Sequence, residues 1–240
     1  DIKDRMEDKM GIGDIFSGIA SVGAAIVGAV VSIAEHVGPM IGECAKVIME
    51  KIKDLDIDIP KCINMIGDIV EILTKIFDID SEQQEVLGAK AEQAEKTVED
   101  FDNDTIAYIN YLKNEIQLDK EKFNSLSQEE KLGYKVTGIA IESQAISQKM
   151  DIEITPDALV LIPKLESQGI NIDARTLVKI FEVLKGEGIQ SLNDVYDLLE
   201  GMGDSDRIKT GEALTKALTE NTDLHVSDLK DAVREFNDNH

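Results

Sequence analysis

Histidine, cysteine and clustered aspartate side chains are the groups in this chain that could bind a metal or carry out catalysis. The three histidines lie far apart in the sequence, and none has the spacing of a metal-binding pair. Three aspartate clusters resemble parts of a calcium loop, but none has the Gly at the sixth position and the Glu at the twelfth that such a loop uses. We interpret these clusters as turns and solvated helix faces. They are Asp54/Asp56/Asp58, Asp100/Asp102/Asp104 and Asp204/Asp206.

Other catalytic signatures are missing from the sequence. No motif of a phosphate-binding loop, a dinucleotide site, a serine nucleophile elbow or a zinc protease occurs. We therefore expect a non-enzymatic protein with no catalytic residues, no metal ligands and no cofactor.

The two cysteines are Cys44 and Cys62, and each falls on an apolar helical stripe. Two buried free thiols are the simpler interpretation. A disulfide between neighbouring helices is the alternative.

An uncharged run of twenty residues, 15–34, is the main candidate for function. It is long enough to cross the hydrocarbon core of a bilayer as a helix, although the whole chain carries a net charge of −23. Such a segment must be hidden, inserted or used for assembly. The candidate membrane or assembly residues are Ile15, Phe16, Ile19, Val22, Ala24, Ile26, Gly28, Val30 and Ile33.

Small residues within this run step by four in two rows, one of Ser17, Ser21, Ala25 and Ala29 and the other of Ala20, Ala24 and Gly28. Such spacing lets two helices approach closely, so leucine at Gly28 should disturb that packing. The run lacks flanking Lys or Arg and an aromatic belt, which makes insertion marginal for one helix and plausible for an assembly.

The polar pair Glu35 and His36 follows the run. It is either an ordinary polar helix end or a pH sensor that controls release of the apolar segment.

Helical patterns extend over the rest of the chain, and we expect an all-α fold. Gly38-Pro39 separates the uncharged helix from a second helix over 40–53. The pair forms an apolar N-terminal hairpin, sheltered at the centre of the soluble protein by amphipathic helices. A heptad seam over 87–112 predicts one long helix, which Asp102-Asn103-Asp104 could break. Capping boxes are expected at Ser81–Gln84 and Ser127–Glu130. The expected domains are 1–58, an apolar hairpin, 59–150, long amphipathic helices, and 151–240, a bundle of short capped helices.

The C-terminal segment reads as short helices, each opened by a capping side chain. Glycines expected to end helices are Gly169, Gly186 and Gly201. Ordinary capped helices and a duplicated unit with a period of about 18 residues both explain the pattern. The expected caps are Thr155, Asp173, Ser191, Thr210 and Ser227.

The first ten residues carry more acids than bases, unlike the positive start of a signal peptide. Because the sequence begins with Asp, we expect a processed product or a fragment. We expect a secreted protein, or a component of a virion or injection machine, rather than a housekeeping cytoplasmic enzyme.

Three functions follow from these features. The first is a membrane-active, pore-forming type of protein that hides its hairpin until it inserts or assembles. An apolar hairpin with long helices is similar in architecture to α-helical pore-forming toxins and colicin pore domains, over about residues 1–125 and without a specific motif. The second is a structural, oligomeric component, because apolar helices with coiled-coil heptads resemble parts of phage tail tape-measure proteins. The third is a monomeric helical module that binds protein partners.

Partners are therefore a membrane or other copies of the chain, reached through the N-terminal apolar helix, with protein partners as an alternative. Nucleic acid is not an expected partner, because the chain has no basic patch to neutralise phosphates.

Overall fold

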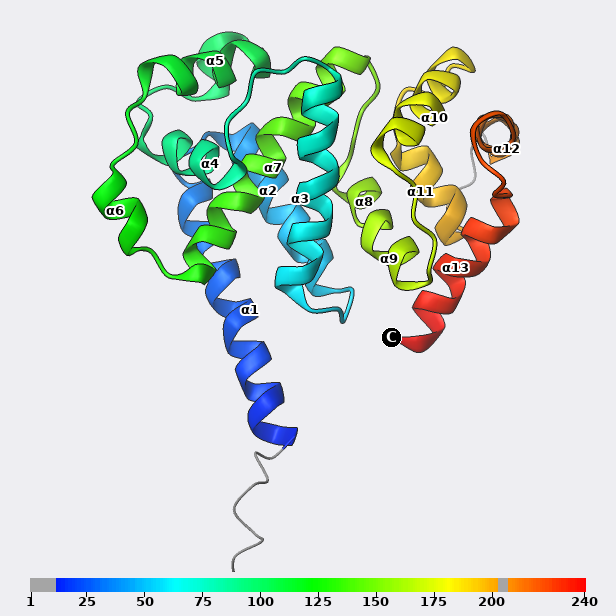
Figure 1. Ribbon diagram of the computed structural model, residues 1–240, viewed down its shortest axis with the longest axis horizontal. Coiled ribbons are helices and arrows are strands. Elements are labelled where there is room, and N and C mark those ends of the chain that lie inside the picture. The colour runs from blue at the N-terminus through cyan, green and yellow to red at the C-terminus, as the bar shows by residue number, and fades with distance from the viewer. Residues whose placement is uncertain (1–11, 203–206) are drawn as a thin grey trace, which may run out of the picture.

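The described part of the chain is helical. The computed structural model describes residues 12–202 and 207–240, with side chains from Val22 onward, and these ranges contain no strand. The first elements are α1 Ile12–Ala34, α2 Pro39–Lys53, α3 Ile59–Ile76, α4 Gln84–Gln93, the 3-10 helix η1 Val98–Phe101, α5 Thr105–Glu115, α6 Lys120–Ser125 and α7 Gln128–Met150. The others are α8 Pro156–Leu159, α9 Leu161–Ser167, α10 Ala174–Gly186, α11 Asn193–Glu200, α12 Arg207–Asn221 and α13 Val226–Asn239 (Figure 1). The expected all-α fold class is confirmed.

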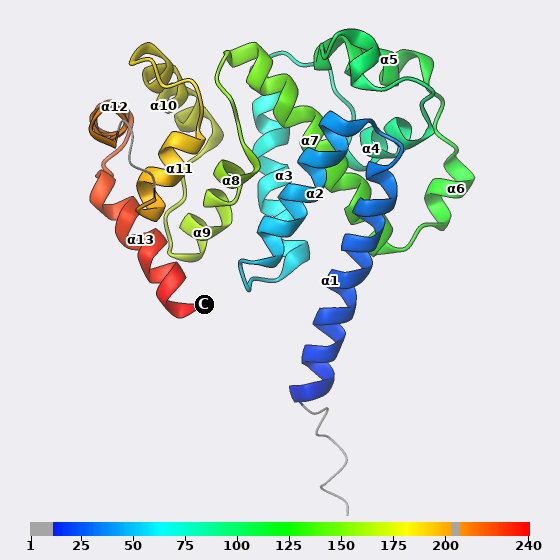
Figure 2. The same cartoon turned by 180° about the vertical axis from the view of Figure 1, so that it is seen from behind.

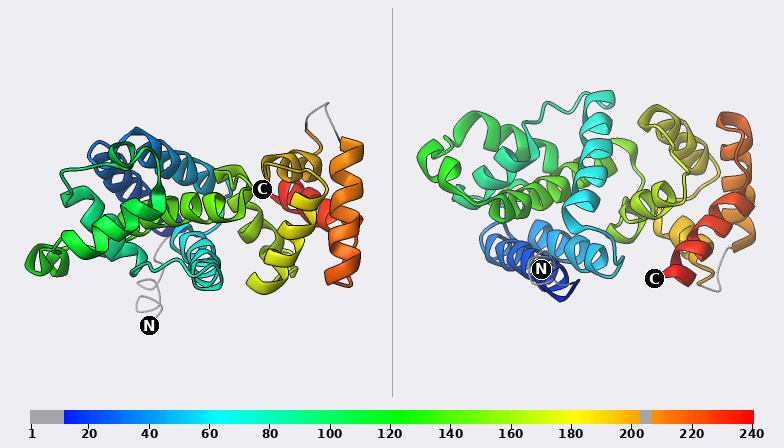
Figure 3. Two further views of the ribbon diagram at one scale, coloured as in Figure 1. Left: turned by 90° about the horizontal axis from the view of Figure 1, so that it is seen from above. Right: turned by 60° about the horizontal axis from the view of Figure 1, so that its bottom comes forward.

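Helix α7 is the central element of the N-terminal half. It contacts α1, α2, α3, α4 and α5, and in the view from above it lies between α2 and α3 (Figure 3). Buried side chains lie on all faces of α7 over residues 133–146, as expected of a core helix. The sequence placed the apolar hairpin at the centre, and this is wrong: the hairpin packs on one side of α7.

Glycines allow α4 and α7 to cross at very short distance. A Cβ atom on Gly88 would overlap the carbonyl oxygen of Tyr134, and one on Gly138 would overlap the carbonyl oxygen of Gln84. The two backbones therefore touch without intervening side chains, which only residues lacking a Cβ permit.

A polar pair lies inside this crossing. The Nε2 atom of Gln84 donates to the Gly67 carbonyl oxygen at 2.9 Å and to Glu142 Oε2 at 2.8 Å. Glu142 is fully buried, and its Oε1 atom has no hydrogen-bond partner among the described residues. Burial raises the pKa of the Glu142 carboxyl group because the charged form is poorly solvated there.

The long helix expected over 87–112 is broken in two. Helix α4 ends at Gln93, and Asp102 and Asn103 both have positive φ angles before α5 begins. The spacing of apolar side chains continues through the break because α4 and α5 pack on the same core. The heptad seam therefore predicted a continuous helix, and this prediction is wrong.

The two expected capping boxes differ in outcome. Ser127 and Glu130 bond reciprocally, with Glu130 N–H donating to Ser127 Oγ at 3.1 Å and Ser127 N–H donating to the Glu130 carboxylate at 2.8 Å. The box at Ser81 and Gln84 is wrong, because α4 begins at Gln84 and the Gln84 side chain is buried against Glu142.

The expected caps of the C-terminal helices are confirmed only in part. Thr155 and Asp173 accept backbone N–H groups at the starts of α8 and α10. Thr210 and Ser227 are not caps, because they lie inside α12 and α13.

The expected glycine helix ends also differ in outcome. Gly169 and Gly201 have positive φ angles, whereas Gly186 is the last residue of α10 and Gly188 makes the turn instead. Helices of four to fifteen residues favour ordinary capped helices over a repeated unit.

One hydrophobic core joins the segments. Its buried residues run from Ile26 on α1 to Phe236 on α13. Helix α3 contacts α9 and α10, and α2 contacts α8. An ion pair of 2.6 Å between Lys51 and Asp157 adds a polar link at the surface.

The variant Glu142→Gln should remove a pH-dependent loss of stability. Because the pKa of Glu142 is raised in the folded state, its contribution to stability falls as pH rises above the ordinary value of 4.5. The free energy of unfolding of the parent should fall relative to the variant by up to about 1.4 kcal/mol per pH unit within that range. Urea unfolding from pH 4.5 to 8 measures this, with exposed Glu115→Gln as control. A difference that stays constant with pH contradicts the assignment.

Candidate functional site: helix α1

Helix α1 has two parts with different surroundings. The start of the helix continues away from the body of the protein (Figure 2), and we call the residues before Val22, 12–21, the projecting part. Residues 22–34 lie against the body and form the docked part. At 1.5 Å per residue the projecting part is about 15 Å long.

The docked part buries one apolar stripe. Ile26, Val30 and Ile33 are 0%, 1% and 3% exposed, and α1 packs on α7 and α2. Their spacing of four and three residues matches the helical stripe expected from the sequence.

Small residues set the depth of this docking. A Cβ atom on Gly133 of α7 would lie 2.7 Å from the Cβ of Ala29, and one on Gly42 of α2 would lie 2.5 Å from the carbonyl oxygen of Ala34. Both contacts are shorter than a Cβ tolerates, so α1 rests directly on glycines of its two neighbours.

The opposite face of the docked part is exposed. Ala24, Gly28 and Ser32 share this face at intervals of four residues, and Val31 beside them is 43% exposed. A Cβ on Gly28 would meet no atom within 4 Å. The expectation that leucine at Gly28 disturbs packing is therefore wrong within this chain, because the close contact lies at Ala29.

The remaining candidate residues do not gather into one site. Val22 is half-buried, while the side chains of Ile15, Phe16 and Ile19 lie outside the described residues. Glu35 and His36 are exposed at the end of α1, where His36 Nδ1 lies 2.9 Å from the Ser32 carbonyl oxygen. Neither residue reaches the buried contact with α7.

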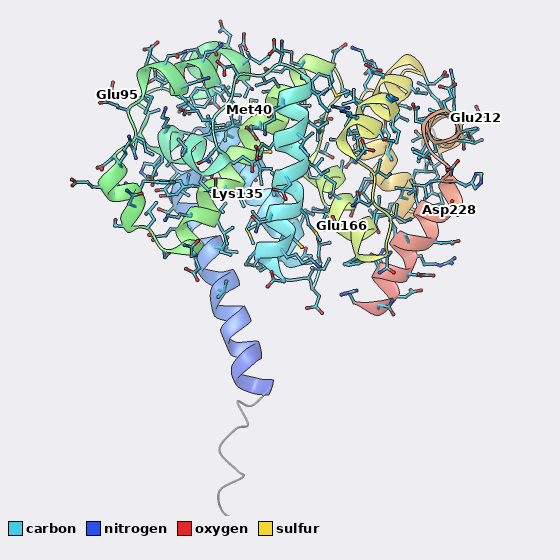
Figure 4. All side chains as sticks on the ribbon, viewed as in Figure 1. Met40, Glu95, Lys135, Glu166, Glu212 and Asp228 are labelled. Atoms are coloured by element: carbon cyan, nitrogen blue, oxygen red, sulfur yellow. The ribbon has the colours of Figure 1, made fainter. Side chains whose placement is uncertain are left out.

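A carboxylate holds the turn between α1 and α2. Gly38 has a φ of +84°, and the backbone N–H of Met40, labelled in Figure 4, donates to Glu99 Oε1 at 2.8 Å. Burial alone would raise the pKa of Glu99, but the hydrogen bond from the Met40 backbone N–H helps to hold it below its ordinary value. Glu99 thus ties the hairpin to η1 and satisfies an N–H at the start of α2.

Aspartates and cysteines have structural roles here. Asp58 and Asp104 cap α3 and α5, and Asp56 and Asp102 have positive φ angles in turns, which confirms the turn interpretation for these four. Within the described ranges, no three His, Cys, Asp or Glu side chains group as metal ligands.

Both thiols are free, which confirms the interpretation of Cys44 and Cys62 as free thiols rather than a disulfide. Burial raises the pKa of Cys44 to about 11 and that of Cys62 to about 12.

Two residues that position α1 were not identified from the sequence. The sequence around Gly133 indicated close helix packing, because Gly133 lies five residues before Gly138 in a stretch with few charges. No sequence pattern indicated the role of Glu99, because it acts on a residue 59 positions earlier in the chain.

Among the residues described with their side chains, no helix is both long and apolar enough to cross a membrane. No protein-family model matches the chain, and neither curated proteins nor solved structures include a similar one.

A matched pair of alanine substitutions tests the docking contact. Gly133→Ala should lower the free energy of unfolding by about 1–3 kcal/mol, because its Cβ would collide with Ala29. Gly28→Ala should raise it by about 0.5–1 kcal/mol, because alanine favours the helix and the space is open. Urea unfolding of both variants measures these changes. Equal changes in the free energy of unfolding of the two variants would rule out the docking geometry.

Proposed function

We propose that this chain is a non-catalytic helical protein that acts on membranes by inserting the projecting part of α1 into a bilayer. The observation that carries this proposal is that α1, which contains the run without charged residues at 15–34, continues beyond the folded body of an acidic protein. Large apolar side chains there, Ile15, Phe16 and Ile19, favour transfer from water to lipid.

Length limits how deep the projecting part can reach. Its length of about 15 Å is half of a hydrocarbon core of about 30 Å. With the docked part in place, α1 therefore enters one leaflet as an anchor and does not cross the bilayer.

Crossing the bilayer would require the docked part to leave α7. Exposing Ile26, Val30 and Ile33 to water costs about 5–9 kcal/mol in all, at about 1.5–3 kcal/mol for each large apolar side chain. This cost favours the docked state until lipid is present to receive the same side chains. Pore formation is therefore a second step that follows anchoring.

The net charge of the protein determines which lipid surfaces it can approach. The net charge of −23 disfavours approach to an anionic surface at neutral pH. A zwitterionic surface is the better target, and protonation of carboxylates at low pH weakens the repulsion from anionic lipid.

Self-assembly through α1 is the second candidate function. The exposed small-residue face at Ala24, Gly28 and Ser32 suits close contact with another helix. The same helix then serves a structural, oligomeric role rather than a membrane role.

A charge in the projecting part should abolish membrane binding. Ile19→Glu replaces a favourable insertion term by an unfavourable one, a change of about 3 kcal/mol, or more than 100-fold in partitioning. Ile208→Glu is the control, because Ile208 is 78% exposed on α12, far along the chain from α1. Co-sedimentation with zwitterionic vesicles and dye leakage at pH 7 and pH 5 give the readout. Equal binding of parent and Ile19→Glu contradicts the proposal.

Light scattering on the same samples separates the second candidate. Assembly without vesicle binding, lost in Gly28→Leu, supports the structural role. A parent that stays monomeric and does not bind vesicles excludes both roles and leaves a module that binds protein partners.

A further inference from the structure

An apolar cavity lies where the C-terminal helices meet α3 and α7. It has a volume of about 130 Å³, and its walls are almost entirely aliphatic. Side chains from both halves of the chain line it, including Val70, Leu73, Ile146, Ile180, Leu184 and Leu214.

The cavity offers water few hydrogen-bond partners in its interior. Ser143 is the one buried polar residue in its lining, and its hydroxyl donates to the Ala140 carbonyl oxygen at 3.0 Å. The other polar lining residues, Glu166 and Asn171, are exposed at the surface. An apolar cavity of about 150 Å³ in another protein stays dry and binds small apolar molecules. By size and chemistry this cavity suits hydrocarbon.

Apolar surface continues outward from the cavity. Half-buried Ile69, Ile170 and Leu177 belong to its lining. Ile72 and Ile76 follow on the same face of α3 and are 43% and 38% exposed. From Ile69 to Ile76 this strip is about 10 Å long. Because the exposed residues Glu166 and Asn171 also line the cavity, it opens to the surface beside them, which suits an elongated molecule with one polar end better than a compact ring.

Charge at the mouth restricts the head group of such a ligand. Glu166, labelled on α9 in Figure 4, is the one charged side chain in the lining. A carboxylate there repels an anionic head group and attracts a cationic one.

We propose that this cavity binds the hydrocarbon chain of a single-chain amphiphile whose head group is uncharged or cationic. The chain occupies the space between α3, α7 and α10, and the head group lies outside near Glu166. This site is separate from α1 and does not depend on the proposed membrane role.

Titration of the full chain with 1-decanol, decylamine and decanoate, each below its micelle concentration, tests the site. Calorimetry and native mass spectrometry should show one decanol or one decylamine per chain, and decanoate should bind at least tenfold more weakly. Absence of saturable decanol binding overturns the site. Decanoate binding as tight as decanol overturns the head-group assignment.

Tryptophan at the mouth should block the site. Leu177→Trp and Ile170→Trp enlarge half-buried lining residues and should weaken decanol binding at least tenfold. Val183→Trp is the control, because Val183 is half-buried on the same helix as Leu177 but does not line the cavity. Unchanged affinity in both mouth variants would place binding elsewhere, for instance on α1, and overturn the proposal.

If a mouth variant does not fold, methyl NMR of the parent protein tests the site instead. Decanol should shift the Ile146 and Ile180 methyl signals, which belong to the lining. Shifts confined to isoleucines of α1 would overturn the assignment.

Discussion

The docking of α1 on α7 is the contact on which the arrangement of the N-terminal half depends. An acidic chain carries a run of twenty residues without charges, 15–34, and one face of the helix that contains it needs cover. Helix α7 supplies the cover because its side chains are buried on all faces over residues 133–146 and because Gly133 lies where Ala29 approaches. Because both helices have small residues at this contact, their backbones come close enough to exclude water from Ile26 and Val30. The hairpin turn and the Glu99 bond to Met40 then fix where α2 runs.

This docking also divides α1 into two parts with different surroundings. The part that touches α7 contributes Ile26, Val30 and Ile33 to the core and is costly to expose, whereas the start of the helix continues away from the body of the protein (Figure 2). The run without charged residues, 15–34, begins before the docked part. Anchoring and assembly both use such a continuation. The C-terminal helices form a second apolar feature, a cavity, at a distance along the chain from α1.

Local patterns in the sequence predicted local structure well. The stripe at Ile26, Val30 and Ile33 and the capping box at Ser127 follow from contacts within one helix. Predictions that depended on distant neighbours failed. The heptad seam predicted one helix across Asp102-Asn103-Asp104, a possible break where the chain makes a left-handed turn. Spacing alone could not tell the open Gly28 from the neighbouring contact at Ala29. The cavity was not predictable either, because its walls come from segments more than 100 residues apart.

Amide hydrogen exchange along α1, with and without zwitterionic vesicles, tests the central claim most directly. The claim is that one helix occupies two environments. Without vesicles, amides of residues 26–34 should exchange slowly and those of residues 15–21 faster, because residues 26–34 pack on α7 and the start of α1 continues away from the body of the protein (Figure 2). Vesicles should slow exchange in residues 15–21 and leave residues 26–34 unchanged. Equally fast exchange in both parts without vesicles, or no protection of residues 15–21 by vesicles, would contradict the account.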